Sequence, residues 1–242
     1  MRPPKLARRM TPKALILAAG RGERMRPLTD RMPKPLLPVH GRPLIAWHLE
    51  ALARAGVREV VINTAWLEEQ FPAVLGNGER FGVSIAYSME GRDHGGALET
   101  AGGIAKALPL LGERFWVVSA DIYAPAFRFD ADAVRAFDAG DDDALLWVVA
   151  NPSFKRDGDF TLDNRGRLLR PASAQERNVT YANIALVRSR LVRGVTPGTC
   201  APLGPLLFDS ARAGRLAGRR LDGPWENVGT PGQLDALNEG SR

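Results

Sequence analysis

Residues 13–38, KALILAAGRGERMRPLTDRMPKPLLP, bring together the residue types that bind a polyphosphate. Gly20 and Gly22 follow an apolar run, and the absence of a Cβ lets the backbone turn sharply there and approach a ligand closely. Backbone N–H groups exposed in such a turn form a nest for anions. Arg24 and Lys34 add cations suited to phosphate oxygens. This stretch therefore predicts a polyphosphate site.

Two common phosphate-binding loops are excluded by the spacing of these residues. The dinucleotide fingerprint G-x-G-x-x-G requires glycine at position 25, where this sequence has Met25. The P-loop pattern, in which G-x-x-x-x-G-K is followed by serine or threonine, does not occur. The predicted site therefore uses a different arrangement of glycines and cations.

Asp121 is a candidate metal ligand, because it follows the apolar segment 115–120, FWVVSA. A carboxylate that faces a phosphate site suits Mg²⁺, which prefers hard oxygen ligands shared with phosphates. Considered by itself, the residue is better explained as a carboxylate that only caps a strand. We expect it to lie near the glycine loop, since ligands of open α/β sheets bind beyond the carboxyl ends of the strands.

A scaffold of alternating strands and helices is needed to position these residues. In the first half, apolar runs and helical spacing predict strands at 14–18, 57–64, 83–89 and 115–120, and helices at 43–56, 67–75 and 98–108, the last interrupted by Gly102 and Gly103. In the second half they predict strands at 144–150, 180–187 and 225–228, a hairpin of 159–162 with 168–170, and helices at 203–213 and from 233 onward. This order predicts an α/β protein whose mainly parallel sheet is flanked by helices.

Length and composition favour a single domain. The 242 residues, of which 45% are hydrophobic, are sufficient for one large core, and no apolar stretch is long enough to span a membrane. Residues 1–12 form a basic tail that we expect to be disordered, with Met1 or Met10 as the start. The net charge of +6 is dispersed and no stacking-aromatic motif accompanies it, so we expect no nucleic-acid partner. The single cysteine, Cys200, predicts a reducing cytoplasmic compartment.

The segment G-x-G-x-R-x-x-P-L-T (20–29), followed by P-K-P (33–35), resembles the signature of the sugar-1-phosphate nucleotidyltransferases. The resemblance covers about residues 13 to 238. It implies a single-domain Rossmann-like (GT-A-like) fold with a mixed, mainly parallel sheet, a nucleotide half at about 13–125 and a sugar-phosphate half at about 126–242. The reaction it implies joins an NTP to a sugar 1-phosphate and releases pyrophosphate.

Roles for individual residues follow from that resemblance. Arg24 would steady the leaving pyrophosphate, Lys34 would hold the reacting phosphates, and Asp121 would bind Mg²⁺. The segment 225–230, WENVGT, resembles W-x-D-[I/V]-G-T, whose aspartate is the second metal ligand; here it is Asn227, which retains an oxygen but brings no charge. Glu226 is a poor substitute, because neighbouring side chains of a strand point to opposite faces. The nucleotide-binding residues implied are Leu17, Ala18, Ala19, Gly20, Gly22, Glu23, Arg24, Lys34, Gly102 and Ser119.

Three further segments resemble the uridylyltransferases of this family that act on N-acetylmuramic acid 1-phosphate in cell-wall recycling. They are LETAGGI (98–104), GDF (158–160) and YANI (181–184), the last with Asn183 where the pattern has glycine. Glu99, Asp159 and Asn183 are therefore expected to contact the sugar phosphate, with UTP as the nucleotide. A monomer or small homo-oligomer is expected.

Other interpretations remain open at this point. A sister enzyme, such as a mannose-1-phosphate guanylyltransferase or a phosphocholine cytidylyltransferase, would share the same signature. A non-catalytic sensor of nucleotide sugars would explain the loss of the aspartate at Asn227. Elsewhere, His48 is expected to be a hydrogen-bonded core histidine, and Asp141, Asp142 and Asp143 a solvated turn.

Overall fold

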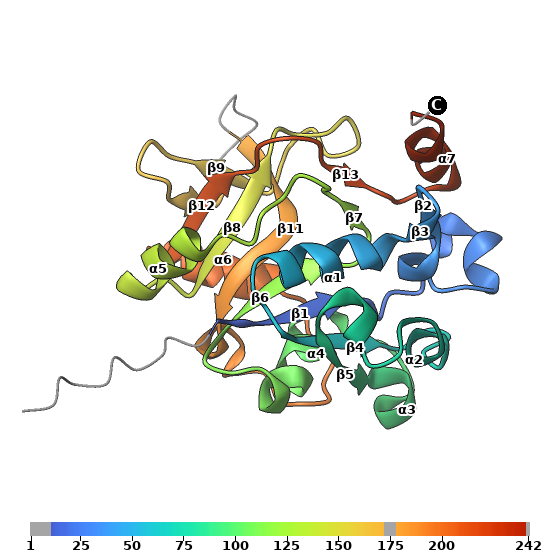
Figure 1. The fold of residues 1–242 in the computed structure, drawn as a ribbon. Helices are drawn as coiled ribbons and strands as arrows, with labels where there is room; N and C mark the ends of the chain where they lie inside the picture. Colours follow the sequence, from blue (N-terminus) through green and yellow to red (C-terminus); the bar gives the residue numbers. More distant parts are fainter. Residues whose placement is uncertain (1–10, 172–177, 241–242) are drawn as a thin grey trace, which may run out of the picture.

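A computed structural model describes residues 11–171 and 178–240 (Figure 1), so most of the predicted tail at 1–12 lies outside the described residues. Their main feature is a nine-stranded mixed sheet in which β10, β9, β11, β6, β1, β4 and β5 lie side by side, while β8 pairs with β11 and β12. One continuous sheet thus joins the first and second halves of the chain through the antiparallel pair of β6 and β11.

The strands of this sheet, apart from β12, agree closely with the predicted ones. They are β1 (Lys13–Leu17), β4 (Glu59–Thr64), β5 (Ser84–Met89), β6 (Arg114–Ser119), β8 (Ala144–Val149), β9 (Phe160–Leu162), β10 (Leu168–Leu169), β11 (Asn178–Arg188) and β12 (Leu216–Arg220). The pairs β1–β4, β1–β6 and β4–β5 are parallel, and β9 and β10 form the predicted hairpin. Two small sheets, β2 (Pro38–Val39) with β3 (Arg42–Pro43) and β7 (Ile122–Tyr123) with β13 (Glu226–Asn227), lie outside it.

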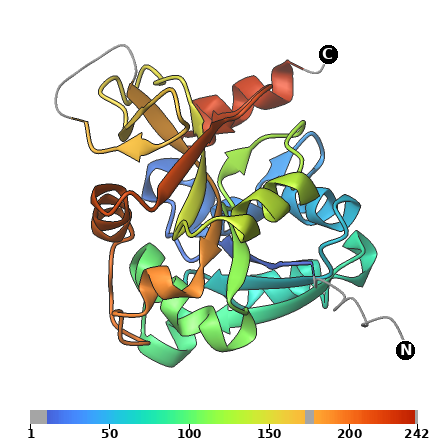
Figure 2. The same cartoon turned by 90° about the vertical axis from the view of Figure 1, so that its left-hand side faces the viewer.

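Helices cover both faces of the sheet (Figures 1 and 2). They are α1 (Leu44–Arg54), α2 (Gln70–Leu75), α3 (Glu90–His94), α4 (Glu99–Ala107), α5 (Ala131–Ala139), α6 (Gly204–Arg212) and α7 (Pro231–Glu239). Alternate residues of β1 supply the two cores: Ala14 and Ile16 pack in a cluster with α1, α2 and α5, whereas Leu15 packs with α4 and α6. The α/β fold predicted from the sequence is therefore confirmed.

The predicted interruption of the helix at Gly102 and Gly103 is wrong. The helix α4 runs through both glycines without a break. A Cβ added at Gly102 would lie 2.2 Å from the carbonyl oxygen of Thr199, and one at Gly103 would lie 2.6 Å from Oε1 of Glu90. Close packing of α4 against its neighbours therefore explains these glycines. Glycine destabilises a helix interior relative to alanine, but only glycine leaves room for that packing.

Three elements of the sheet and its cover, α3, α5 and β12, were not predicted. The strand β12 reads LAGRR, which lacks the apolar alternation that marks a half-buried strand. A third apolar cluster, formed by Met25, Leu37, Val39, Leu44, Val228 and Leu234, packs α7 against the segment that follows the glycine loop. The C-terminal helix therefore supports the opening stretch of the chain.

Candidate active site

The glycine loop leaves β1 at the carboxyl end of the sheet. Gly22 has a φ of 66°, a left-handed conformation that favours glycine. Its carbonyl oxygen accepts hydrogen bonds from the Thr29 hydroxyl at 2.8 Å and from the backbone N–H of Met25 at 2.9 Å. Within the described residues, the backbone N–H groups of Gly20 and Gly22 donate to no protein acceptor. The loop is thus held from below while its donors remain available to an anion.

Lys34 and Asp121 meet beside this loop. The Nζ of Lys34 lies 2.7 Å from Oδ2 of Asp121, with 12% and 26% of the two side chains exposed. Asp121 directly follows the turn after β6, where the N–H of Ala120 bonds to the carbonyl oxygen of Leu17 at 2.9 Å. The pairing of β1 with β6 therefore carries the carboxylate to the glycine loop, as the sequence predicted.

Asn227 reaches the same region from the far end of the chain. It pairs with Ile122 in the two-stranded sheet of β13 and β7, and the N–H of Val228 bonds to the carbonyl oxygen of Asp121 at 2.9 Å. Its Oδ1 is buried and has no hydrogen-bond partner in the described residues. Glu226 instead accepts a hydrogen bond from Nε2 of Gln233 at 2.9 Å, on α7. A buried oxygen without a protein partner, on a segment whose backbone pairs with that of Asp121, is available as a cation ligand.

A cavity of about 350 Å³, the loop cavity, opens over these residues. The predicted site residues that line it are Leu17, Ala18, Ala19, Gly20, Gly22, Lys34, Glu99, Ser119 and Asp121. Within the chain described, no group of three or more histidine, cysteine, aspartate or glutamate side chains is arranged to hold a metal ion. A cation in this cavity would therefore need ligands beyond the protein carboxylates, such as phosphate oxygens.

A buried pair behind the loop cavity fixes its wall. Oδ1 of Asn63 accepts the backbone N–H of Ala18 at 2.8 Å, and its Nδ2 donates to Oε1 of Glu90 at 2.7 Å. Oε2 of Glu90 in turn accepts the N–H of Leu98 at 2.8 Å. Burial raises the pKa of Glu90 above its ordinary value, against these hydrogen bonds, which lower it. The pair ties the ends of β1 and β4 to the start of α4.

A second cavity of about 310 Å³, the α6 cavity, adjoins the first. Both are lined by Leu17, Glu99, Thr100 and Ser119, and the second also by Asp159, Asn183 and the start of α6. Glu99 and Asn183 each have a φ of 58°, which is uncommon for a residue other than glycine. Asn183 lies where β11 shifts register against β8, so the bulge there requires the left-handed conformation that the glycine of the sequence pattern would supply. Strained residues at a cavity indicate a functional constraint.

Four predicted residues lie outside the walls of both cavities. Glu23 and Arg24 are exposed next to the glycine loop, and a Cβ added at Gly229 would lie 3.6 Å from Nη2 of Arg24. Gly102 donates its backbone N–H to Ala201 at 3.2 Å and packs against the 199–201 segment, so the structure does not bring it to the nucleotide-binding residues predicted with it. Asn227, described above, is the fourth.

Sequence reasoning missed several residues that line the cavities. In the loop cavity they are Pro35, Asn63, Ala97 and Thr100, and in the α6 cavity they include Phe160, Tyr181, Leu203, Leu207 and Phe208. Asn63 was detectable, because it is the first polar residue after an apolar strand and so lies at the same sheet edge as Asp121. The residues of α6 carried no such signal, since apolar residues at helical spacing indicate only a core.

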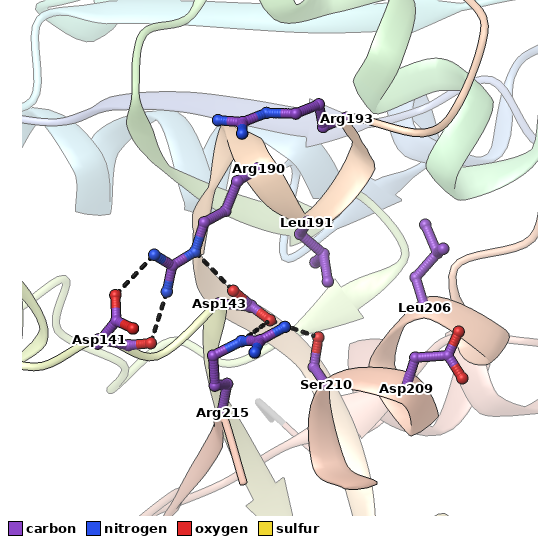
Figure 3. A pocket seen from close by; sticks show the side chains of 9 residues that line it. All are labelled: Asp141, Asp143, Arg190, Leu191, Arg193, Leu206, Asp209, Ser210 and Arg215. Carbon is purple, nitrogen blue, oxygen red and sulfur yellow. Dashed lines mark hydrogen bonds and ion pairs between the residues drawn. The ribbon is translucent and has the colours of Figure 1, made fainter. Parts of the chain in front are cut away.

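The prediction of a solvated turn at 141–143 is wrong for Asp143. Asp143 is only 4% exposed, and it accepts hydrogen bonds from Nε of Arg190 at 2.6 Å, Nε of Arg215 at 2.9 Å and the hydroxyl of Ser210 at 2.9 Å. Figure 3 shows both arginines converging on this carboxylate, with Asp141 pairing the outer edge of Arg190. We call Asp143, Arg190, Ser210 and Arg215 the Asp143 cluster. Burial raises the pKa of Asp143, but the hydrogen bonds from its three partners outweigh this effect and hold it below its ordinary value.

The prediction for His48 is confirmed. Its Nε2 lies 2.7 Å from the carbonyl oxygen of Ile122, and the residue is 3% exposed on the inner face of α1. Burial lowers its pKa to about 4, against the raising effects of that carbonyl and of Asp121. His48 thus supports the segment that follows Asp121 as a neutral group.

In the described part of the chain, no helix has the length and apolar character needed to cross a membrane.

Comparisons with known proteins support this geometry. The family model described as nucleotidyl transferase matches residues 13–166. The chain is 46% identical over 224 residues to the N-acetylmuramate alpha-1-phosphate uridylyltransferase of Neisseria meningitidis, covering 90% of this chain and 93% of that protein. It is 33% identical over 226 residues to the Caulobacter vibrioides protein of the same name, at 90% and 92% coverage. In fold it is similar to a Bacillus anthracis protein solved in complex with a sucrose, with a TM-score of 0.78, 23% identity and 95% of each chain covered.

Proposed function

We propose that this chain, which belongs to the nucleotidyl transferase family, transfers a uridylyl group from UTP to N-acetylmuramic acid 1-phosphate. The family membership and the enzyme class follow from the family model and from two relatives that match nearly the whole chain. The observation that carries the proposal is the pair of adjoining cavities, one under the glycine loop and one under α6, which share Leu17, Glu99, Thr100 and Ser119. Two substrates that react with each other require such a junction.

The reaction is a single displacement at the α-phosphorus of UTP. An oxygen of the sugar phosphate forms a bond to that phosphorus, and the bond from the phosphorus to the oxygen that bridges to the β-phosphate breaks. Pyrophosphate leaves with the electron pair, and UDP-sugar remains. No covalent intermediate on the protein is needed, so orientation and neutralisation of charge supply the rate enhancement.

In this proposal the residues of the loop cavity orient the triphosphate. The free N–H groups of the glycine loop hold phosphate oxygens, and Lys34, between the loop and Asp121, neutralises the reacting phosphates. Arg24, exposed beside the 226–230 segment, receives the leaving pyrophosphate. Glu99, Asp159 and Asn183 orient the sugar in the α6 cavity.

Asp121 and Asn227 fit a Mg²⁺ ion. One carboxylate and one buried amide oxygen without a protein partner are the hard oxygens that this ion shares with phosphates and water. When bound, Mg²⁺ would neutralise phosphate charge. The observation that supports the pair is the hydrogen bond from Val228 to Asp121, which keeps β13 beside the carboxylate.

A turnover panel tests the proposal. Pyrophosphate release is measured with each of four NTPs against N-acetylmuramic acid 1-phosphate, N-acetylglucosamine 1-phosphate and mannose 1-phosphate. UTP with N-acetylmuramic acid 1-phosphate is expected to give the highest kcat/KM. Faster turnover of GTP with mannose 1-phosphate would replace the proposal by the guanylyltransferase alternative. Binding of a nucleotide sugar without turnover of any pair would indicate a sensor.

A further inference from the structure

The α6 cavity differs in chemistry from one end to the other. Where it joins the loop cavity, Glu99, Thr100 and Ser119 supply polar groups. Towards α6 its walls include Phe160 and Phe208, whose ring centroids lie 5.4 Å apart. A ligand that fills the whole cavity must therefore present hydroxyl or phosphate groups at one end and apolar groups at the other.

The carboxylate of Asp159, which lies on the cavity wall, already has one protein partner at each oxygen. Its Oδ1 lies 2.5 Å from Nζ of Lys155, and its Oδ2 accepts the backbone N–H of Tyr181 at 3.0 Å. The charge of Lys155 is therefore already balanced by Asp159 and is not available to a ligand. A second anion brought into the cavity by a ligand needs another cation, because Glu99 and Asp159 would otherwise repel it.

Arg170 supplies a cation close to the aromatic end of the α6 cavity. It follows β10, and its exposed side chain places Cζ 5.2 Å from the centroid of the Phe208 ring, which itself lines the cavity. Within residues 11–171 and 178–240 its guanidinium has no ion pair and donates no hydrogen bond. Stacking on an aromatic ring fixes the plane of a guanidinium while leaving its N–H edge free for a planar oxyanion.

We propose that Arg170 determines substrate specificity by binding a carboxylate that the sugar itself carries, while the Phe160–Phe208 wall receives the apolar part of the same substituent. The inference rests on the proposed function and assigns to Arg170 the recognition of the acidic group that the sugar carries. N-acetylmuramic acid differs from N-acetylglucosamine by a lactyl ether, which consists of a methyl group and a carboxylate. The charge and the apolar wall of this end of the cavity match those two groups.

The test compares two sugar 1-phosphates that differ only in the lactyl ether. With UTP saturating, kcat/KM is measured for N-acetylmuramic acid 1-phosphate and N-acetylglucosamine 1-phosphate in the wild type and in Arg170→Gln, Arg170→Lys and Arg212→Gln. Arg212 is the matched control, because it lies on α6 and pairs with Asp209 away from the cavity. Calorimetry with UDP-N-acetylmuramic acid and UDP-N-acetylglucosamine measures the same discrimination without turnover.

In Arg170→Gln the ratio of the two kcat/KM values is expected to fall about tenfold through a higher KM for the acidic sugar, since a charge-assisted hydrogen bond is lost. Arg170→Lys should recover part of the ratio, and Arg212→Gln should keep it. An unchanged ratio in Arg170→Gln, or an equal loss with both sugars, would overturn the inference. If the wild type turned over no sugar 1-phosphate, the proposed function would fail, and calorimetry would still decide the role of Arg170: equal affinity of Arg170→Gln and wild type for UDP-N-acetylmuramic acid would overturn it.

Discussion

Asp121 and Asp143 are both carboxylates that bind cations at strand ends, but they differ in how many of their oxygens have hydrogen-bond partners. Asp143 has both oxygens bonded, by two arginines and a hydroxyl, and is 4% exposed. Asp121 has one oxygen bonded to Lys34, lies on the wall of a cavity, and accepts through its backbone a hydrogen bond from Val228, the residue after Asn227, whose side-chain oxygen is unpaired. A buried charge with all its hydrogen-bonding capacity used stabilises the fold, whereas unused capacity at a cavity indicates a ligand.

The two regions also lie at opposite ends of the same sheet. The Asp143 cluster lies at the start of β8 and β12, while Asp121 follows the end of β6, which runs parallel to β8. Ligands of open sheets bind beyond the carboxyl ends of parallel strands. The cavity of about 390 Å³ lined by the Asp143 cluster lies at the opposite end of the sheet, where we expect side chains to stabilise the fold instead of binding a ligand. Substitutions in the two regions should then affect different measurements.

The largest effect is expected for Lys34→Ala. Loss of the cation that faces the phosphates should lower kcat/KM about 10²–10³-fold, as removal of one preorganised donor does. The midpoint of thermal unfolding should change little, because the side chain lies on a cavity wall. Pyrophosphate release checks the first statement. Arg24→Ala should follow the same direction, and Lys13→Ala, at the other end of β1, is the control. Near-normal turnover in Lys34→Ala would contradict the interpretation of this stretch as a polyphosphate site.

The opposite pattern is expected for Asp143→Asn, with turnover per folded molecule retained and stability reduced by about 2–3 kcal/mol, because two arginines lose a buried partner. The pKa of Asp143 is lower in the folded protein than in the unfolded chain. Its stabilisation is therefore present at neutral pH and is lost as the pH falls below about 4, through the folded-state pKa.

Urea unfolding of the wild type and Asp143→Asn at pH 7 and pH 3 measures this difference, which should shrink at the lower pH. Asp141→Asn is the matched control, since that side chain is 81% exposed and shares Arg190. A loss of activity without a loss of stability in Asp143→Asn would place the cluster among the functional groups and break the comparison.

A smaller effect is expected at Asn227. Asn227→Asp adds a charge to the shell of a divalent ion and should lower the Mg²⁺ concentration for half-maximal rate several-fold, whereas Asn227→Ala should raise it. Asp121→Asn should be worse than either, because it removes the carboxylate that remains. Titration of the rate with Mg²⁺ checks the order of the three variants. An unchanged Mg²⁺ dependence in Asn227→Ala would leave the buried oxygen without this role, and Glu226→Gln would be tested next.

The smallest effect is expected at Asn183, on the wall of the α6 cavity. Asn183→Ala should cost about 1 kcal/mol, because a left-handed φ is unfavourable for a residue with a Cβ, whereas Asn183→Gly should be nearly neutral. Urea unfolding compares the two variants. If both were equally stable, the strain at this bulge would be too small to matter. If Asn183→Gly kept its stability but raised KM for the sugar 1-phosphate, the amide would be a contact to the sugar.

Much of the candidate site was predictable because its residues follow the carboxyl ends of neighbouring strands. Gly20 and Asp121 were brought together by the rule that parallel strands present their carboxyl ends at one edge, and the structure agrees. Apolar runs predict β1, β4 and β6 with boundaries close to those observed. Local chemistry and a simple topological rule were sufficient there.

The remainder depends on contacts between distant segments, which no local pattern contains. Asp143 is followed by a strand and preceded by two acids, and only the arrival of Arg190 and Arg215 from other elements makes it a buried group. Gly102 resembled a helix breaker because its packing partner, Thr199, is far away in the chain. The apolar residues that line the α6 cavity, such as Phe160 and Phe208, were missed for the same reason.

The pairing of β13 with β7 has a consequence for the order of synthesis. A ribosome produces the glycine loop, Lys34 and Asp121 early, and domains begin to fold from the amino terminus. Asn227 and α7 are among the last described residues to be made, and β7 has no partner in its small sheet until they emerge. A nascent chain therefore carries the glycine loop, Lys34 and Asp121 well before the buried amide oxygen of Asn227, and the proposed centre can be complete only after β13 has emerged and paired with β7.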